Sequence, residues 1–378
     1  MLNPNWLGRL AAYHPDRPAL WFRNTWLTYG ELYLRARKAA GALRALGVAK
    51  GDRVGLIAWN HPAYLDLLLG HILTPFNHRL SLPELQALHA YTEPKVLFYG
   101  EGFQEVARAL DPKALPLEAL LEGEEAPEEV RVDLEDPALL LFTGGTTGLP
   151  KGALLPYRQL LVNAVQTAFS WGLSREDRYI LATPMFHAAL NALATPLLYL
   201  GSQVVVEERF HAEEYLELVR LHRPTLLFLV PTMYQMLLEA QAFAETDLSS
   251  VRFAISGGAP CPAPVREAFR ERGVRFKQGY GLTECGVNCF TFELEEAERY
   301  PESVGRPMPH LWARLVREDG KEAGVGEAGE LWLSGSVVMK GYFRRPEENE
   351  KVFVWDGERL WLRTGDLAHR DEGGRVYI

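Results

Sequence analysis

Short apolar runs alternate with longer segments of helical spacing over the first three-quarters of the chain. Thr28 and Glu31 form a capping box, which predicts a helix that ends at Gly47. Ser81 and Glu84 predict a second helix start in the same way. Strands are predicted over residues 53–59, 96–99, 138–143, 179–183, 203–206, 225–230, 251–256 and 274–277, with helices over residues 212–222, 232–244 and 262–272.

The order of these elements predicts the fold class. Strands that alternate with helices imply parallel sheets covered by helices, and therefore an α/β fold. After about Tyr300 the chain changes to short strands separated by turns rich in glycine, proline and charge, which predicts a small β-rich subdomain. The acidic stretch at residues 118–129 is predicted to be a solvated surface loop. A chain of 378 residues, 47% of them hydrophobic, can bury more than one core, so two or three subdomains are expected.

The segment LLFTGGTTGLPKGALL, residues 140–155, carries the strongest chemical signal in the chain. An apolar run leads into a loop of three threonines and three glycines, and Lys151 and a second apolar run follow. Glycines let successive N–H groups converge on an anion, threonine hydroxyls add donors, and the lysine adds a cation. No Walker A triplet is present, and Pro150 has no N–H to donate. This chemistry suits a polyphosphate; the alternative is an ordinary Gly/Thr hairpin turn.

Charge and cysteine content bear on other classes of protein. The net charge of −9 argues against a general nucleic-acid binder, because phosphate contacts need a basic face. Cys261, Cys285 and Cys289 show no zinc-type spacing, and an odd count without a signal peptide predicts a reducing cytoplasm. The longest apolar stretch, residues 188–200, is interrupted by Thr195 and Pro196 and is too short to span a bilayer.

One motif matches a known fingerprint but lacks its structural context. Residues 324–329, GVGEAG, match the dinucleotide fingerprint GxGxxG. No apolar strand leads into them, and a strand-like run follows them where the fingerprint needs a helix. We therefore predict a hairpin turn at this position.

Four further motifs accompany the phosphate loop: ISGGAP (255–260), QGYGLTE (278–284), GELWLSG (329–335) and RTGDL (363–367). In this order and at these intervals they resemble the acyl-adenylate-forming (AMP-binding) family, which includes acyl- and aryl-CoA synthetases, peptide-synthetase adenylation domains and firefly-type luciferases. The resemblance runs over essentially the whole chain. It implies two helix-covered, largely parallel sheets in αβαβα layering, with ATP- and acyl-binding subdomains in residues 1–299 and the β-rich subdomain in residues 300–378.

The resemblance also implies two departures from the family. In the family a hinge and a small C-terminal lid domain, which carries the adenylation lysine, follow the position of Ile378. The chain is therefore expected to correspond to the large N-terminal domain, and no lysine in it is assigned that role. The run Tyr64–Gly70 joins His71 more abruptly than in the family, so either a shortened helix or absent residues are expected there.

The resemblance implies how ATP and magnesium are held. Glu284 matches the family's Mg²⁺ ligand, with Thr143 as its partner, and a hard oxygen ligand suits a magnesium ion that bridges phosphates. As an isolated residue, Glu284 would be interpreted as a surface carboxylate. The residues implied for the β- and γ-phosphates are Thr143, Gly144, Gly145, Thr146, Thr147, Gly148 and Lys151. Lys151, Glu284 and His187 are the predicted catalytic residues.

The resemblance places adenosine against the turn at residues 256–260. Tyr280 can stack on adenine, and Asp366 resembles the residue that accepts hydrogen bonds from the ribose hydroxyls. In isolation, both would be interpreted as ordinary turn residues. The residues implied for this part of the nucleotide are Gly257, Gly258, Ala259, Gln278, Gly279, Tyr280, Gly281, Thr283 and Asp366.

His187 occupies the position that borders the substrate carboxylate and the entry of the thiol in the family. Amino-acid-activating members have an aspartate just after the phenylalanine, whereas this chain has Phe186-His187-Ala188. A substrate ammonium would be left unpaired there, at a high cost in free energy. A simple carboxylic acid with an apolar body is therefore expected, and the residues implied for its acyl part are His187, Ala188, Gly281 and Val287.

These inferences predict an AMP-forming acid–thiol ligase that uses ATP and Mg²⁺ to activate a carboxylic acid, with coenzyme A as co-substrate. We expect a fatty acid. An aryl-CoA ligase is the nearest alternative, and a module that binds ATP or acyl-AMP without turnover is an alternative of a different class. The expected partners are a small carboxylic acid, ATP and coenzyme A, without nucleic acid or a membrane-spanning segment. A cytoplasmic location and a homodimer are further expectations.

Overall fold

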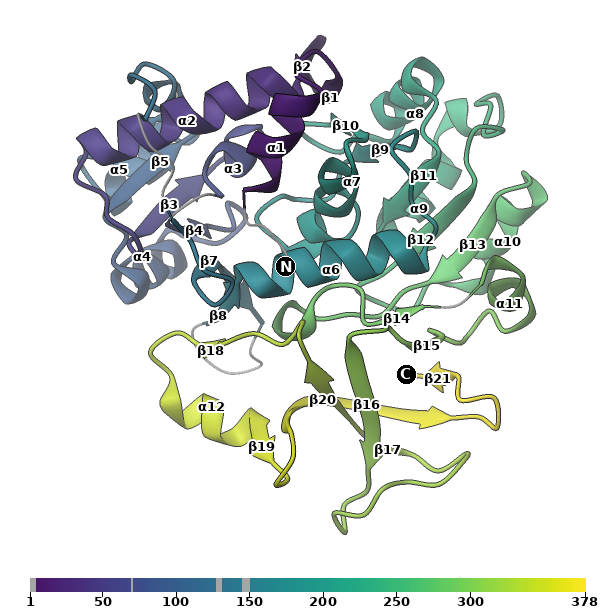
Figure 1. Ribbon diagram of the computed structural model, residues 1–378. Coiled ribbons are helices and arrows are strands. Elements are labelled where there is room, and N and C mark those ends of the chain that lie inside the picture. The colour runs from purple at the N-terminus through teal and green to yellow at the C-terminus, as the bar shows by residue number, and fades with distance from the viewer. Residues whose placement is uncertain (1–4, 69–70, 127–130, 145–149, 292) are drawn as a thin grey trace.

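The computed structural model describes residues 5–68, 71–126, 131–144, 150–291 and 293–378 (Figure 1). Its helices are α1 (Trp6–Tyr13), α2 (Tyr29–Ala45), α3 (Ala63–Asp66), α4 (Leu82–Thr92), α5 (Gln104–Leu110), α6 (Tyr157–Ser170), α7 (Ala194–Leu200), α8 (Ala212–His222), α9 (Pro231–Glu239), α10 (Ala263–Glu271), α11 (Leu294–Arg299) and α12 (Pro346–Val352). Single 3-10 turns are η1 (Leu117–Leu120), η2 (Ala188–Asn191), η3 (Gln241–Phe243) and η4 (Thr283–Cys285).

Two larger sheets and a smaller one organise the chain. The first sheet runs in the order β18 (Gly341–Tyr342), β8 (Lys151–Pro156), β7 (Pro137–Thr143), β4 (Ile72–Pro75), β3 (Arg53–Ile57), β5 (Val96–Tyr99) and β6 (Leu115–Pro116). The second runs β13 (Arg275–Gln278), β12 (Phe253–Ser256), β11 (Leu226–Leu229), β9 (Arg178–Leu181), β10 (Gln203–Val206), β1 (Pro18–Phe22) and β2 (Thr25–Thr28). The small sheet runs β16 (Leu311–Val316), β17 (Gly329–Gly335), β20 (Leu360–Arg370) and β19 (Phe353–Trp355), with β21 (Val376–Tyr377) on β20, and β14 (Phe290–Thr291) pairs with β15 (Arg306–Pro307).

Both larger sheets are mainly parallel. In the first, β8 runs antiparallel to both of its neighbours, β7 and β18, and in the second β2 runs antiparallel to β1. The small sheet is antiparallel throughout. In Figure 1, α6 runs across the middle of the molecule between the two larger sheets, and the small sheet lies below them. The predicted α/β fold with two helix-covered parallel sheets and a small β-rich subdomain is confirmed.

Side chains that alternate between the two faces of each strand form three apolar cores, one central and two outer. On β9, Tyr179 and Leu181 face the central core, whereas Ile180 faces the outer core that α8, α9 and α10 cover. On β3, Val54 also faces the central core, and Ile57 faces the outer core under α4 and α5. Because side chains of a strand alternate between its two faces, each sheet contributes to the central core and to one outer core. This is the predicted αβαβα layering.

Local sequence signals begin and end the helices as expected. The Thr28 hydroxyl accepts a hydrogen bond from Glu31 N, and the Glu31 carboxylate accepts one from Thr28 N, so the capping box opens α2. Ser81 and Glu84 form the capping box of α4. The GVGEAG segment lies in the connection between the antiparallel strands β16 and β17, which confirms the predicted hairpin turn.

The acidic stretch at residues 118–129 is not simply a solvated loop, and that prediction is wrong for its described part. Leu120 in η1 is 1% exposed, and Ala126 is buried as well. Ala126 N donates a hydrogen bond to Arg37 O in α2, at 3.1 Å. The apolar residues interspersed among the glutamates therefore anchor the segment on α2.

Two features bear on the expected subdomains. The helix that the sequence indicated as shortened, α3, has four residues, and β4 begins at Ile72 soon after it. The two-residue strand β18 comes from the region after residue 300, yet it pairs with β8 of the first sheet. The boundary between residues 299 and 300 stays a prediction. Within the described ranges, no helix has both the length and the apolar character needed to cross a membrane.

Glu207, just after β10, is a buried carboxyl at the rim of the second sheet. Its Oε1 accepts a hydrogen bond from His211 N at 3.2 Å, and Oε2 is buried without a hydrogen-bond partner among the described residues. Burial raises the pKa of Glu207 to about 8. In the folded protein the carboxyl therefore keeps its proton at neutral pH, whereas in the unfolded chain it is ionised.

This difference predicts that Glu207→Gln stabilises the protein at alkaline pH. Between about pH 4.5 and 8 the unfolded wild type loses a proton that the folded state keeps, so its stability falls by up to roughly 1.4 kcal/mol per pH unit. The amide carries no proton that titrates. Urea unfolding of both proteins should show equal stability at pH 4 and a higher free energy of unfolding for the variant at pH 8. Parallel pH profiles for the two proteins would contradict the prediction.

Candidate active site

The predicted site residues gather where strands of both larger sheets end. Thr143 and Lys151 lie opposite each other in the antiparallel hairpin of β7 and β8, on either side of the phosphate loop. In the second sheet, Ser256 and Gln278 end the parallel strands β12 and β13. Carboxyl ends of parallel strands share one edge of a sheet, and ligands of open α/β sheets bind outside that edge.

Lys151 is held in a charged contact with α12. Its Nζ lies 2.6 Å from Glu348 Oε2 and 5.1 Å from the centre of the Tyr342 ring. Glu348 also bonds Lys351 Nζ at 2.6 Å. The two lysines hold the pKa of Glu348 down at about 2, so this carboxylate is ionised across the working pH range. The ammonium that should bind phosphate therefore already has an anionic partner.

Glu284 is anchored by the neighbouring strand β18. Its Oε1 accepts a hydrogen bond from the Tyr342 hydroxyl at 2.8 Å, and its backbone oxygen accepts one from Met339 N at 2.8 Å. Glu284 is 9% exposed, so it does not lie in an open loop as a surface carboxylate would. Burial and the charge of Glu284 raise the pKa of Tyr342, against a hydrogen bond with Thr143 that lowers it. Tyr342 thus contacts three of the residues predicted for phosphate and metal, namely Thr143, Lys151 and Glu284.

These residues fit a magnesium ion that is shared with phosphates. No group of three or more His, Cys, Asp or Glu side chains among the described residues could hold a metal alone. Mg²⁺ usually keeps several waters and binds through one or two carboxylates plus substrate phosphates. Glu284 with the Thr143 hydroxyl nearby supplies such an incomplete set. A magnesium ion held by these residues would neutralise phosphate charge.

The loop predicted for adenine is shaped by Gln278. Its Oε1 accepts from Cys261 N at 3.1 Å, and its Nε2 donates to Ala259 O at 3.2 Å. Gly279 N donates to Ser256 O at 2.7 Å, which closes the other side of the loop. The Gln278 side chain therefore fixes the backbone of this loop through two hydrogen bonds. Gly257, Gly258 and Ala259 lie in the loop itself, and Gly258 and Ala259 are exposed.

The structure joins the two residues predicted for adenine and ribose. The Tyr280 hydroxyl donates to Asp366 Oδ2 at 2.5 Å. Burial, followed by the hydrogen bond to Asp366, raises the pKa of Tyr280. Asp366 lies in an irregular part of β20, where Gly365 has φ +79° and the register with β17 shifts. The tyrosine uses Oδ2 of Asp366, and among the described residues no hydrogen bond is made to Oδ1, which can accept one from a hydroxyl group.

The acyl residues form a separate edge of the site. His187 is exposed, and its ring contacts the Phe186 ring, with centres 4.5 Å apart. Partial burial of the imidazole, with the charge of Arg79, lowers the pKa of His187, so the neutral form predominates at pH 7. Ala188 is 8% exposed. A Cβ on Gly281 would meet Val287 O at 2.0 Å, so this wall tolerates only glycine.

The structure thus brings two groups of predicted residues together and leaves His187 apart. In the first group, Tyr342 contacts Thr143, Lys151 and Glu284; in the second, Tyr280 contacts Asp366. Among the described residues, no hydrogen bond or ring contact joins His187 to either group. Thr283 O accepts a hydrogen bond from Gln159 Nε2 in α6, at 2.9 Å. The predicted phosphate residues Gly145, Thr146, Thr147 and Gly148 lie outside the described residues, and Gly144 is exposed.

Sequence reasoning missed Tyr342 and Glu348. Both follow the GELWLSG motif in the segment GYFRRPEEN, which had no assigned chemistry. The available signal was Gly341-Tyr342, a glycine before a buried aromatic residue in an otherwise polar segment. Nothing in the local sequence indicated that this segment pairs with β8.

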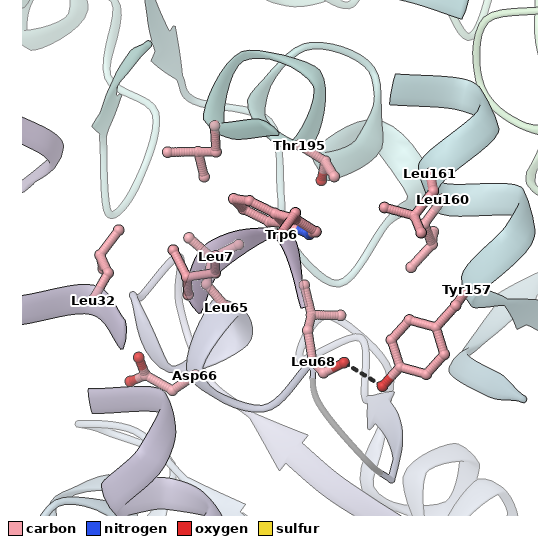
Figure 2. A pocket seen from close by; sticks show the side chains of 11 residues that line it. Trp6, Leu7, Leu32, Leu65, Asp66, Leu68, Tyr157, Leu160, Leu161 and Thr195 are labelled. Carbon is pink, nitrogen blue, oxygen red and sulfur yellow. Dashed lines mark hydrogen bonds between the residues drawn. The ribbon is translucent and has the colours of Figure 1, made fainter. Parts of the chain in front are cut away.

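An apolar cavity lies elsewhere in the fold (Figure 2). It measures about 40 Å³ and is lined by residues of α1, α2, α3, α6 and α7. Leucines make most of its wall, Asp66 lies at one side, and the Tyr157 hydroxyl donates to Leu68 O at 2.6 Å. None of the predicted site residues lines this cavity. It therefore belongs to the packing between the sheets and not to the candidate site.

The fold and the site together define a class of nucleotide-dependent α/β enzyme, with a Gly/Thr hairpin for phosphate and an acidic metal ligand. The chain belongs to the AMP-binding enzyme family, whose pattern matches residues 7–343. The predicted family is therefore confirmed.

Known relatives are CoA ligases. A feruloyl-CoA synthase from Amycolatopsis sp is 36% identical over 383 residues, which cover 99% of this chain and 77% of the relative. An indoleacetate–CoA ligase from Aromatoleum aromaticum is 34% identical, with 99% and 77% covered. The solved o-succinylbenzoate coenzyme A synthetase from Bacillus subtilis, in complex with ATP and magnesium ion, is 30% identical with a TM-score of 0.88, and 99% and 78% of the two chains are covered.

These relatives confirm the predicted enzyme class, an acid–thiol ligase, and the predicted nucleotide and metal at the level of the family. The names of these three relatives refer to feruloyl, indoleacetate and succinylbenzoate groups. The roles of individual residues stay predictions.

We expect Tyr342→Phe to weaken the Mg²⁺-dependent part of ATP binding roughly tenfold, because partners that orient a metal ligand typically contribute that much. The ring that faces Lys151 stays, and only the hydroxyl on Glu284 is lost. Calorimetry should show the loss with MgATP and little change with ATP in EDTA. Tyr29→Phe is the control, since it removes one buried hydroxyl that lies near Leu198 O at 3.0 Å and Ser202 O at 2.7 Å, away from the site. Equal loss with and without Mg²⁺ would exclude an effect on the metal.

We expect Glu348→Gln to tighten binding of MgATP about threefold, because Lys151 loses the anion that competes with phosphate; partly exposed ion pairs have effects of this size. The gain should shrink as salt is raised. Glu347→Gln on the same helix is the control, since Glu347 lies near Arg345 at 3.8 Å and not near Lys151. Weaker binding by Glu348→Gln would mean that the carboxylate orients the lysine and does not compete for it.

Proposed function

We propose that this chain activates an aryl carboxylic acid with ATP and Mg²⁺ to the acyl adenylate and transfers the acyl group to coenzyme A. The observation that carries the proposal is the meeting of Thr143, Lys151 and Glu284 around Tyr342. Two anions, a carboxylate and a triphosphate, must come together in such a reaction. One cation and one metal ligand at the same point provide the electrostatic stabilisation that this step needs.

Each group of residues has a part in this proposal. Lys151 and the phosphate loop hold the β- and γ-phosphates, and Glu284 with Thr143 holds the magnesium ion. Asp366 accepts from the ribose with the oxygen that Tyr280 leaves free. Neutral His187 borders the carboxylate of the acid without adding a charge that would stabilise it as an anion.

The names of the relatives support an aryl acid, because they refer to feruloyl, indoleacetate and succinylbenzoate groups. A fatty acid is the second candidate, and the apolar character of Ala188 is compatible with it.

A panel of acids in the ATP–pyrophosphate exchange assay tests the proposal. Ferulate, indole-3-acetate and 2-succinylbenzoate should stimulate exchange, decanoate less so, and phenylalanine not at all. Lys151→Ala should lower the rate about a hundredfold, because loss of one preorganised charge at the reacting phosphates has this effect. Decanoate as the best acid would replace the aryl assignment. ATP binding without exchange for any acid would support a binding module.

A further inference from the structure

A buried amide, Asn60, joins the two larger sheets beside His187. Asn60 comes after β3 of the first sheet and is 6% exposed. Its Nδ2 donates to Thr183 O at 3.1 Å and to Glu207 O at 3.0 Å. Its Oδ1 accepts a hydrogen bond from Met185 N at 2.8 Å. Both N–H donors and the acceptor of one side chain are therefore used on backbone groups.

All of these partners lie in the segments that directly follow two strands of the second sheet. Thr183 and Met185 follow β9, and Glu207 follows β10. The backbone of Asn60 adds a fourth bond, from its N–H to Glu208 O at 3.2 Å. A single residue at the end of β3 thus fixes the ends of two strands of the other sheet.

The loop after β9 carries His187, and Asn60 determines its backbone. Met185 is 1% exposed, so its N–H has no access to water and needs the Asn60 oxygen. An amide can donate twice and accept at the same time, whereas a carboxylate can only accept. The Phe186 ring adds an edge contact with His78 at 4.9 Å.

We propose that Asn60 is the positioning residue of the acyl side of the site, and that it acts through the loop of residues 183–187 on His187. The proposal rests on the proposed function, because it assigns the carboxylic acid to the His187 edge. Asn60 makes no contact with the phosphate or ribose residues among those that the structure describes. Its loss therefore affects the acid and not the nucleotide.

Asn60→Asp tests this proposal with little change in size. The aspartate keeps an acceptor for Met185 N but loses both donors, and it faces two carbonyl oxygens. The KM for the acid in the exchange assay should rise about tenfold, while the KM for ATP stays within twofold of wild type. Asn60→Ser, which can donate once, should lie between the two and serves if Asn60→Asp does not fold.

The matched control is Tyr29→Phe. The Tyr29 hydroxyl is fully buried and shares its one proton between Leu198 O at 3.0 Å and Ser202 O at 2.7 Å, so the variant also removes the donor that faces two backbone oxygens. It does not contact the loop of residues 183–187. Equal effects of Asn60→Asp and Tyr29→Phe on the acid KM would reduce Asn60 to a structural role and overturn the proposal.

Coupling to His187 provides a second test. If Asn60 acts through His187, Asn60→Asp should raise the acid KM less than twofold in a His187→Ala background, because the effects of residues that act as one unit do not add. Full additivity would overturn the proposal.

Hydrogen exchange separates this proposal from the proposed function. Peptides that cover residues 183–188 should exchange at least tenfold faster in Asn60→Asp and unchanged in Tyr29→Phe, with no substrate present. Unchanged exchange in Asn60→Asp would overturn the proposal directly. A different outcome would separate the two proposals: no acid-dependent ATP–pyrophosphate exchange in the wild type, but faster amide hydrogen exchange in Asn60→Asp. This outcome would contradict the aryl-CoA ligase function and still show that Asn60 holds the loop.

Discussion

The structure depends on one shared apolar layer between its two larger sheets. Each sheet turns one face of its strands to this layer, so Val54 of β3 and Tyr179 of β9 belong to the same core. Two sheets that bury a common layer cannot move independently, because a shift of either would open cavities in a close-packed interior. The carboxyl edges of both sheets are therefore fixed relative to each other. A site made from the ends of strands in two different sheets needs this rigidity.

Much of the fold was predictable because its signals are local. The capping boxes at Thr28 and Ser81 begin helices within four residues of sequence, and apolar runs such as residues 203–206 and 96–99 became strands with those bounds. The acidic segment was misjudged, since the burial of Leu120 depends on α2, more than seventy residues earlier in the chain. Local composition indicates solvation of the glutamates but not the destination of the leucines between them.

The candidate site was predictable to the extent that motifs carry it. Glu284, Tyr280 and Asp366 stand in recognisable motifs, whereas Tyr342 is found only through its contact with Glu284, 58 residues away in sequence. The bond between Tyr280 and Asp366, which spans 86 residues, was likewise not predictable. Asn60 is a stronger example, because its bonds reach residues more than a hundred positions away. Periodicity and spacing cannot indicate such bonds, since they arise when separate elements pack. The class of acid was also beyond local reasoning, because small side chains admit alkyl and aryl groups alike.

The pairing of β18 with β8 has a consequence for the edges of the molecule. β8 would end the first sheet with a row of unpaired N–H and C=O groups next to the phosphate loop, and such an edge is open to pairing with another chain. Gly341 and Tyr342 cover it. Residues after 300 therefore protect the edge of the first sheet. Their release would expose β8 to pairing with other chains, and hence to aggregation, and would also remove Tyr342 from Glu284.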